Sequence, residues 1–246
     1  MAVLILAMVL DFQNCQLSTL NCQLFNNMIT VHHLNNSRSQ RILWLLEELE
    51  LAYDIKYYER DPQTMLAPAS LRQVHPLGKS PVITDDELTV AESGAIVEYL
   101  VDRYGAGKLA PAPGTPERLR YTYWLHYAEG SAMPPLLLKL IFDRIEQEPL
   151  PFFVKPIAKL ISSRTKSAFI DPQIAQHFDY LEAELTNSRW FVGDEFTAAD
   201  IQLSFPIEMA RIDSSRPKLM SYLDRIHERP AYQQALSRGG AYELLS

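Results

Sequence analysis

The sequence predicts a small α/β domain followed by an all-α domain, and three observations carry that prediction. Strand and helix patterns alternate over about 80 residues from residue 28 onward. Residues 105–116 then hold three Gly and three Pro. After that segment only helical patterns recur. Because Gly- and Pro-rich segments are typical of domain boundaries, we place the α/β domain at residues 28–108, a linker at 109–116 and the helical domain at 117–246.

The first domain opens with a strand, a helix and a second strand. Residues 28–34 and 52–58 have the short, alternating or apolar-rich pattern of strands. Between them, apolar side chains recur at the helical spacing i, i+3, i+4, i+7, at Ile42, Leu45, Leu46 and Leu49. Two strands joined by a helical crossover pair in parallel.

A hairpin and a further helix complete this domain. Pro62 and Pro68 mark a loop that holds at most a short helix. Residues 81–83 and 88–90 flank two aspartates, which is a hairpin signal. Helical spacing then returns at residues 93–104.

The second domain is expected to contain only helices. A long helix is predicted for residues 117–148, with a kink near Pro134 and Pro135. Residues 152–185 are also helical in pattern, with breaks at Pro156 and Pro172. Shorter helices are expected at residues 198–211, 217–228 and 231–238.

Residues 1–27 are expected to be an extension outside the fold. The first ten form an apolar run that no Lys or Arg precedes, since the first such residue is Arg38. Ten apolar residues are too few to span a bilayer, and no clean signal-cleavage site follows them. Met28 is then the natural start of the folded part. A secretory signal is the alternative interpretation.

Composition and charge exclude several classes of function. The chain has 23 Lys and Arg against 30 Asp and Glu, a net charge of −7, and its basic residues are scattered, which argues against a nucleic-acid partner. Both cysteines, Cys15 and Cys22, lie in the extension. The folded part therefore has no disulfide framework, no Cys-based metal site and no cysteine nucleophile. We expect a cytoplasmic protein without a metal or a membrane contact.

The segment NNSRSQR, residues 35–41, lies between the first strand and the first helix. At a helix start, free N–H groups and the helix dipole favour negative charge. A ligand thiol held against the Ser37 hydroxyl would therefore ionise more readily. The alternative is structural, because Ser37 and Gln40 match the capping box S-x-x-Q, which needs no catalytic role.

Two further segments predict contacts to an extended, peptide-like ligand. In HPLGKSPV, residues 75–82, Pro81 is a candidate cis peptide after a Gly-containing turn, and the backbone of Ser80 is free to pair with a ligand. Glu92 offers a carboxylate to a ligand amine, and Ser93 offers a hydroxyl and an N–H to a ligand carboxylate. A plain turn and a plain helix start are the structural alternatives.

A fourth segment, FTAADI, is expected to be structural. Thr197 and Asp200 match the capping box T-x-x-D, and Phe196 and Ile201 occupy the hydrophobic staple positions. This segment starts a buried helix at a fixed angle, and we expect no chemistry there.

These four segments, in this order and with the linker after the third, resemble the cytosolic glutathione transferases. SRSQRILWLLEEL resembles the first helix of the serine-type, theta-like classes; HPLGKSPVI resembles the cis-proline turn, AESGAIVEYL the glutathione motif and WFVGDEFTAADI the capping-box helix. YWLHYAEGSAMPPLLL resembles a bacterial and fungal subgroup. The resemblance covers about residues 28–239. It implies a thioredoxin-like first domain, glutathione as co-substrate and a homodimer.

The resemblance also implies residue roles. Ser37 would hydrogen-bond the glutathione sulfur, and the backbone of Ser80 would pair with the cysteinyl unit. Lys79 stands at a position that often binds glutathione. Glu92 and Ser93 would hold the γ-glutamyl head.

One position departs from the family pattern. The serine-type plant classes place a His or Lys after the second strand to meet the glycine carboxylate, and this chain has Leu66 and Ala67 there. Lys79 and His75 are the candidates for that contact instead.

The expected thiol activation needs no metal. A free cysteine thiol has a pKa near 8.5, and lowering it by two units takes about 2.7 kcal/mol. A charge-assisted hydrogen bond contributes roughly 1.5–3 kcal/mol, and a helix N-terminus up to about 2 kcal/mol. Ser37 at its helix start therefore suffices, and the neighbouring Asn35 and Asn36 are alternative donors.

The expected activity is detoxifying conjugation of the glutathione thiolate to hydrophobic electrophiles, with peroxidase activity as a further expectation. The electrophile site is expected between the domains. Candidates to line it, or to pack the core, are Tyr121, Tyr123, Trp124, Tyr127, Met133 and Leu137. His126 and Glu129 are expected to be plain polar groups. Two alternatives stay open: a non-catalytic scaffold or binding module, and a glutathione-dependent disulfide reductase that uses no protein cysteine.

Overall fold

A computed structural model describes residues 28–61, 64 and 66–243. The extension expected at residues 1–27 lies outside the described residues. A four-stranded sheet with the strand order β2-β1-β3-β4 forms the base of the first domain. Its strands are β1 (Ile29–Leu34), β2 (Tyr53–Tyr58), β3 (Val82–Asp85) and β4 (Leu88–Ala91).

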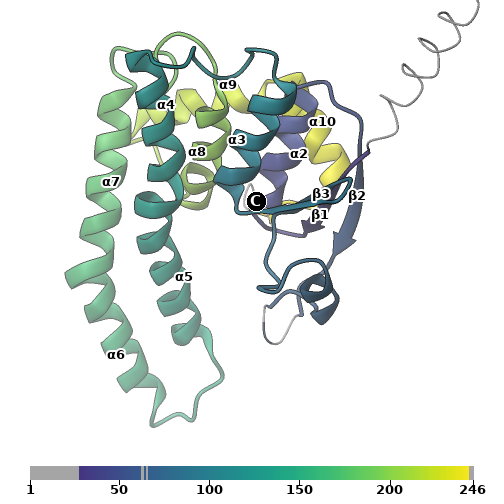
Figure 1. The fold of residues 1–246 in the computed structure, drawn as a ribbon. Helices are drawn as coiled ribbons and strands as arrows, with labels where there is room; N and C mark the ends of the chain where they lie inside the picture. Colours follow the sequence, from purple (N-terminus) through teal and green to yellow (C-terminus); the bar gives the residue numbers. More distant parts are fainter. Residues whose placement is uncertain (1–27, 62–63, 65, 244–246) are drawn as a thin grey trace, which may run out of the picture.

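The sheet is mixed because its connections differ. Helix α2 (Ser39–Glu48) crosses from β1 to β2, and these strands pair in parallel. Strand β3 pairs antiparallel with both β1 and β4. Helix α3 (Ser93–Tyr104) packs beside α2 on one face of the sheet, and the 3-10 helix η1 (Ala69–Gln73) lies toward the other face (Figure 1). The predicted thioredoxin-like arrangement is confirmed.

Helices make up the described part of the second domain, as predicted. Two long helical rods stand side by side and extend well beyond the sheet (Figure 1). The last three helices return toward α2, and α10 packs directly along it. In chain order the helices are α4 (Pro116–Tyr127), α5 (Met133–Gln147), α6 (Lys155–Thr165), α7 (Asp171–Glu184), α8 (Ala198–Met209), α9 (Pro217–His227) and α10 (Pro230–Gly239).

Two π-helical turns interrupt the rods. The first, η2 (Ala128–Ala132), separates α4 from α5 and precedes Pro134 and Pro135, which lie in the first turn of α5. Because η2 runs directly into α5, Pro134 and Pro135 have no N–H for the carbonyls of Gly130 and Ser131 four residues earlier, and the irregularity falls on those residues. Pro156 likewise lies in the first turn of α6, and this helix begins at Lys155 rather than at residue 152 as predicted. The second π turn, η3 (Lys166–Ile170), leads into α7.

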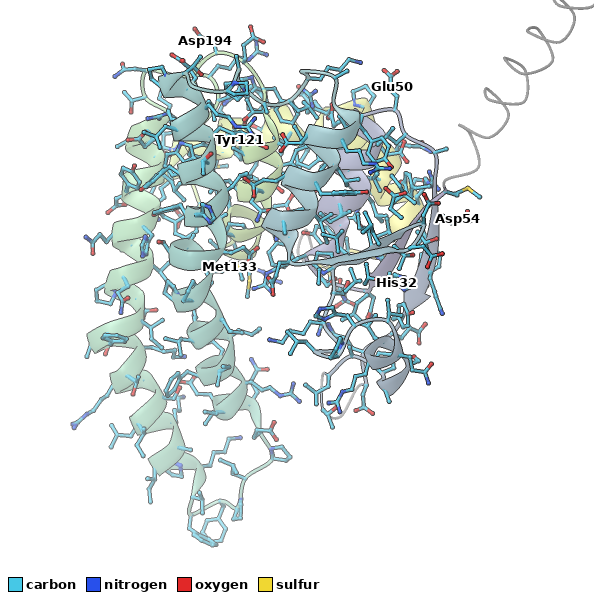
Figure 2. All side chains as sticks on the ribbon, in the orientation of Figure 1. His32, Glu50, Asp54, Tyr121, Met133 and Asp194 are labelled. Carbon is cyan, nitrogen blue, oxygen red and sulfur yellow. The ribbon has the colours of Figure 1, made fainter. Side chains whose placement is uncertain are left out.

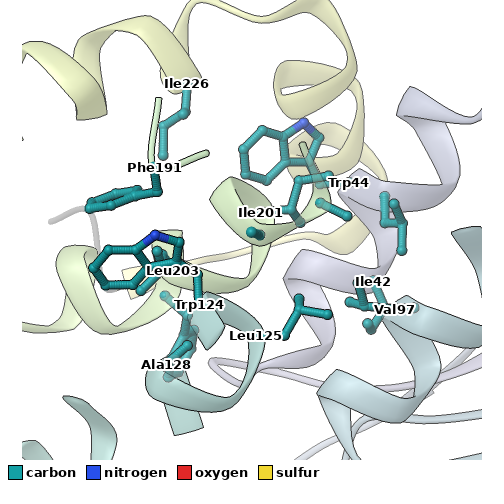
Figure 3. Close-up of a cluster of buried hydrophobic side chains, with 14 of the residues drawn as sticks. Ile42, Trp44, Val97, Trp124, Leu125, Ala128, Phe191, Ile201, Leu203 and Ile226 are labelled. Carbon is teal, nitrogen blue, oxygen red and sulfur yellow. The ribbon is translucent and has the colours of Figure 1, made fainter. Parts of the chain in front are cut away.

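One hydrophobic core joins the two domains. Trp44 of α2 and Val97 of α3 belong to the same buried cluster as Trp124 of α4 and Leu203 of α8 (Figure 3). Each of these side chains is buried. Because the helical domain packs on α2 and α3, it fixes the helices whose first turns follow the predicted ligand-binding segments.

The expected capping box at the start of α8 is formed. The Asp200 carboxylate accepts hydrogen bonds from Thr197 N at 2.9 Å and Thr197 Oγ1 at 3.1 Å, and its other oxygen accepts one from Phe191 N at 3.0 Å. Burial raises the pKa of Asp200 to about 6, although these hydrogen bonds oppose the rise. Within the described residues, the helices are too short or too polar to cross a membrane.

Candidate functional site

Ser37 lies in the turn between β1 and α2, with its side chain almost fully buried. Its Oγ lies 2.7 Å from Ser39 Oγ and accepts a hydrogen bond from Ser39 N at 3.2 Å. The helix begins at Ser39, one residue later than a capping box on Ser37 and Gln40 requires, and its N-cap residue Arg38 makes no side-chain cap. Ser37 is therefore not the N-cap residue that the box predicts, but its hydroxyl lies beside the first turn of α2 and accepts the backbone N–H of Ser39, which is the structural contact that a capping serine makes.

Asn35 and Asn36 use their side chains for structural contacts. Asn35 Oδ1 accepts a hydrogen bond from Arg60 N at 3.0 Å. Asn36 has a positive φ of 49° and pairs with Glu243 through two hydrogen bonds, of 3.0 and 2.8 Å. The two amides thus hold the chain after β2 and the C-terminal segment against the β1–α2 turn.

The turn before β3 places a backbone segment next to the end of β1. The peptide bond between Ser80 and Pro81 is cis. Ser80 Oγ donates to the carbonyl oxygen of His32 at 2.9 Å, which ties this turn to β1. Lys79 is exposed, and His75 is half-buried at the start of the turn. Gly78 has a φ of 58°, a conformation that glycine adopts without strain.

Glu92 and Ser93 lie at the N-terminus of α3, as its N-cap and first residue. Glu92 is exposed and has φ 73° and ψ 126°, a backbone conformation that residues other than glycine rarely adopt. Such strained residues cluster at functional sites, where the surrounding fold holds them in place. Ser93 is buried, and its Oγ accepts a hydrogen bond from Arg41 Nη2 at 3.1 Å.

Arg41 links the N-terminus of α3 to the helical domain. Its guanidinium, with a side chain 1% exposed, donates to the carbonyl oxygen of Gln202 and to Glu129 Oε1, the latter at 2.5 Å. Arg38 Nε pairs with Glu129 Oε2 at 2.9 Å. Burial alone would raise the pKa of Glu129, but the charges and hydrogen bonds of Arg41 and Arg38 hold it below its usual value.

The sequence did not predict this ion-pair cluster. Glu129 was expected to be a plain polar group, yet it lies in the π turn η2 and bridges two arginines of the first domain. A single acidic residue in a helix carries no signal of its partner when that partner lies 88 positions away. His126 has no such place in the cluster.

The aromatic and apolar candidates on the long helix divide between core and surface. Tyr121, Trp124, Tyr127 and Met133 are buried, and Tyr127 Oη lies 2.7 Å from His177 Nδ1. Tyr121 and Met133 lie on the successive helices α4 and α5 (Figure 2). Tyr123 and Leu137 are exposed. These two are the members of the set with accessible surface.

Comparisons with known proteins bear on what such a site does. The family model described as "Glutathione S-transferase, N-terminal domain" matches residues 26–102, and "Glutathione S-transferase, C-terminal domain" matches residues 143–230. Glutathione S-transferase 3 of Schizosaccharomyces pombe is 36% identical over 215 residues, which cover 86% of this chain and 88% of the relative.

The chain belongs to the glutathione S-transferase family. Glutathione S-transferase 1 of Saccharomyces cerevisiae is 33% identical over 74% of this chain and 81% of the relative. A solved glutathione S-transferase from Actinobacillus pleuropneumoniae is 33% identical with a TM-score of 0.71, covering 88% of this chain and 95% of that one. Fold and sequence agree, so the chain is a glutathione transferase enzyme. Glutathione is its co-substrate.

Proposed function

We propose that Ser37 stabilises the glutathione thiolate for attack on a hydrophobic electrophile. The observation that carries this proposal is the position of the Ser37 hydroxyl beside the first turn of α2, in an almost fully buried setting. A hydrogen bond to a charged group contributes roughly 1.5–3 kcal/mol. The helix N-terminus adds up to about 2 kcal/mol in a partly buried site. On this proposal the enzyme is a serine-type transferase, and activation of the thiol requires no metal.

We propose that the glutathione peptide lies along the turn before β3 and the N-terminus of α3. The backbone of Ser80 pairs with the cysteinyl unit, and Glu92 and Ser93 hold the γ-glutamyl head. Two observations support this proposal. Glu92 is exposed and has a strained backbone conformation. Ser93 begins helix α3, and a helix N-terminus favours binding of a ligand carboxylate. For the glycine carboxylate we propose exposed Lys79, with His75 as the alternative.

The Ser37→Ala variant tests the role of Ser37. We expect the pKa of the bound glutathione thiol to rise by about one to two units, because a thiolate hydrogen bond worth roughly 1.5–3 kcal/mol is lost. The measurement is the pH dependence of kcat/KM for a standard aromatic electrophile, with circular dichroism as the control for folding. An unchanged pH dependence in a folded variant would remove Ser37 from this role. Asn35 and Asn36 would then be the remaining candidates, despite their structural contacts.

A disulfide reductase is a second candidate, which similarity to one relative supports. The disulfide-bond oxidoreductase YfcG of Escherichia coli is 28% identical over 85% of this chain. The same residues would bind glutathione for that reaction, for conjugation and for a peroxidase reaction. A substrate panel of an aromatic electrophile, an organic hydroperoxide and a mixed disulfide separates the three by relative kcat/KM. A scaffold without catalysis predicts neither activity nor retention on immobilised glutathione.

We propose a cytoplasmic homodimer that detoxifies small electrophiles. Exposed apolar side chains on α5 and α6 support a buried face between two copies, since such side chains gathered on a surface mark interaction sites. They include Leu137, Leu140, Ile141, Ile157, Leu160 and Ile161. Size-exclusion chromatography with light scattering tests the homodimer. The Leu140→Glu variant, which places a charge on this face, should shift the measured molar mass from that of a dimer to that of a monomer.

We propose that the domains divide as residues 28–108 and 117–246, joined by a linker at 109–116. The described chain supports this, because α3 ends at Tyr104 and α4 begins at Pro116. Limited proteolysis that cleaves first within residues 105–116 would fit this division, and first cleavage inside α2 or α4 would contradict it.

A further inference from the structure

A polar cavity lies in the helical domain between the end of α7 and helix α9. Its volume is about 380 Å³, within the range of about 300–1,000 Å³ that small-molecule pockets have. It is lined by residues 185–189, which follow α7, and by the face of α9 that carries Lys218, Ser221 and Arg225. In Figure 1, α9 and the last turn of α7 lie at the top of the view, away from the sheet. No residue of the proposed glutathione site lines this cavity.

Three cationic side chains line the cavity, and no carboxylate does. Lys218 and Arg225 are seven positions apart on α9, so they lie on one face of the helix, and Arg189 faces them from the segment after α7. Among the described residues, none of the three forms an ion pair. The adjacent Glu182 carboxylate accepts the backbone N–H groups of Lys218 and Leu219 at 2.8 and 2.9 Å. It therefore serves the N-terminus of α9 rather than the three cations.

Arg225 is held in a fixed position at the cavity wall. Its Nη1 donates to Ser221 Oγ at 2.9 Å, its Nη2 donates to the carbonyl oxygen of Arg189 at 2.7 Å, and its guanidinium lies 5.2 Å from the ring centroid of Trp190. Burial and the charge of Arg189 lower the pKa of Arg225, although acidic neighbours such as Asp224 oppose this. An anion between the two arginines would offset the repulsion between them.

The remaining lining groups are mostly hydrogen-bond donors that the fold does not use. The side chains of Asn187, Ser188, Arg189 and Lys218 make no hydrogen bond to another described residue. Ser221 accepts from Arg225, so its own proton stays available. Such a lining does not suit a hydrophobic electrophile. It does not suit glutathione either, because the glutathione amine would meet three cations and no carboxylate.

We propose that this cavity is a second ligand site, which binds a small molecule bearing a phosphate monoester, with Lys218, Arg189 and Arg225 as its charged contacts. A phosphate monoester carries nearly two negative charges at neutral pH and three acceptor oxygens, which match a cluster of cations and hydroxyl donors. The net charge of −7 repels a long polyanion such as nucleic acid, so the ligand is a small one. The site is independent of the proposed role of Ser37.

The test is calorimetric titration of inorganic phosphate into the full-length enzyme. S-methylglutathione is present at saturation to occupy the glutathione site, and sodium chloride keeps the ionic strength constant so that screening does not change. We expect one saturable site per chain with a Kd of about 1 mM or below. Lys218→Gln and Arg225→Gln should each raise this Kd about tenfold, because each removes a charged contact. Lys159→Gln is the matched control, since Lys159 is an exposed cation of α6 outside the cavity, and its Kd should equal that of the parent enzyme.

The variants differ in their effect on the fold, which keeps the test decisive. Arg225→Gln removes two hydrogen bonds, whereas the exposed Lys218 side chain makes none, so Lys218→Gln decides the outcome if Arg225→Gln folds poorly. A Kd well above 1 mM, or the same Kd for Lys218→Gln and Lys159→Gln, would overturn the proposal. Succinate that binds as tightly as phosphate would replace the phosphate monoester by a dicarboxylate. Binding of poly-glutamate without binding of phosphate would assign the three cations to contact with an acidic protein instead.

Discussion

The ion pair between Glu129 and Arg41 should be one of the larger single contributions to the stability of this enzyme. In the Glu129→Gln variant, the Arg41 guanidinium keeps its contacts to Gln202 and Ser93 but loses its counter-charge. Arg41 has a side chain only 1% exposed, so water cannot replace the carboxylate at that end. Glu129 itself is 29% exposed, which reduces the effect.

The magnitude follows from these exposures. Removing one partner of a fully buried pair costs about 3–5 kcal/mol. Exposed pairs contribute about 0.2–1 kcal/mol. With one end buried, the other partly hydrated and a glutamine oxygen still able to accept, we expect a loss of about 2 kcal/mol in the free energy of unfolding. For a chain of this size that lowers Tm by about 4–8 °C.

The assay is urea unfolding followed by circular dichroism, with a thermal scan as a second measurement. Glu148→Gln is the control, because the Glu148 side chain is 48% exposed in its pair with Arg144, and it should lose less than about 0.5 kcal/mol. The arginines lower the pKa of Glu129 in the folded state, so its contribution is present above the usual value of 4.5 and is lost as pH falls through the lowered one. A loss below about 0.5 kcal/mol at pH 7, or a difference from the parent enzyme that grows toward pH 3, would refute the reasoning.

Substitutions at three further places in the fold have expected outcomes: the α8 cap, Gly239 and Glu92. Asp200→Ala removes the acceptor of two Thr197 hydrogen bonds and should lower the free energy of unfolding in urea by about 3 kcal/mol. Thr197→Ala should lower it less. Equal small losses in the two variants would show that the cap contributes little. Gly239→Ala places a Cβ 2.2 Å from Gln40 Oε1 and should cost about 1–3 kcal/mol in the same assay, whereas unchanged stability would mean that Gln40 moves freely. Glu92→Gly relieves a φ of 73° and should keep or raise Tm while glutathione KM rises, and Glu92→Ala should raise KM without that relief; an unchanged KM in both would remove Glu92 from the binding site.

Local patterns predicted the fold because its elements are locally specified. The period of the apolar residues from Ile42 to Leu49 and the hairpin signal around Asp85 were each visible within a dozen residues. The capping box at Thr197 succeeded for the same reason. The similar box at Ser37 was displaced by one residue, because α2 begins at Ser39 rather than at Arg38 and the motif alone does not fix the first helical residue.

The candidate site could be predicted only in part, because its hydrogen bonds join distant segments. Ser37, Ser80 and Glu92 stand in recognisable motifs at the ends of strands or the starts of helices. The partners that surround them do not: Arg41 meets Glu129 across 88 positions and Gln202 across 161. Periodicity cannot reveal such pairs, since it reports only how a residue fits the helix that contains it and not which residue of another segment it contacts.

Those distant partners decide what the predicted hydroxyls can do. Arginine only donates hydrogen bonds, so the contact from Arg41 to Ser93 occupies an acceptor position of Ser93 and leaves its proton available. A serine at a helix start with a free proton suits a ligand carboxylate, which is the proposed role of Ser93. Ser37 differs, because the neighbouring Ser39 hydroxyl can either donate a hydrogen bond to Ser37 Oγ or accept one from it. The Ser37 proton is available to a ligand only while Ser39 is the donor. The sequence can thus place a hydroxyl, but the direction of its proton depends on the group behind it.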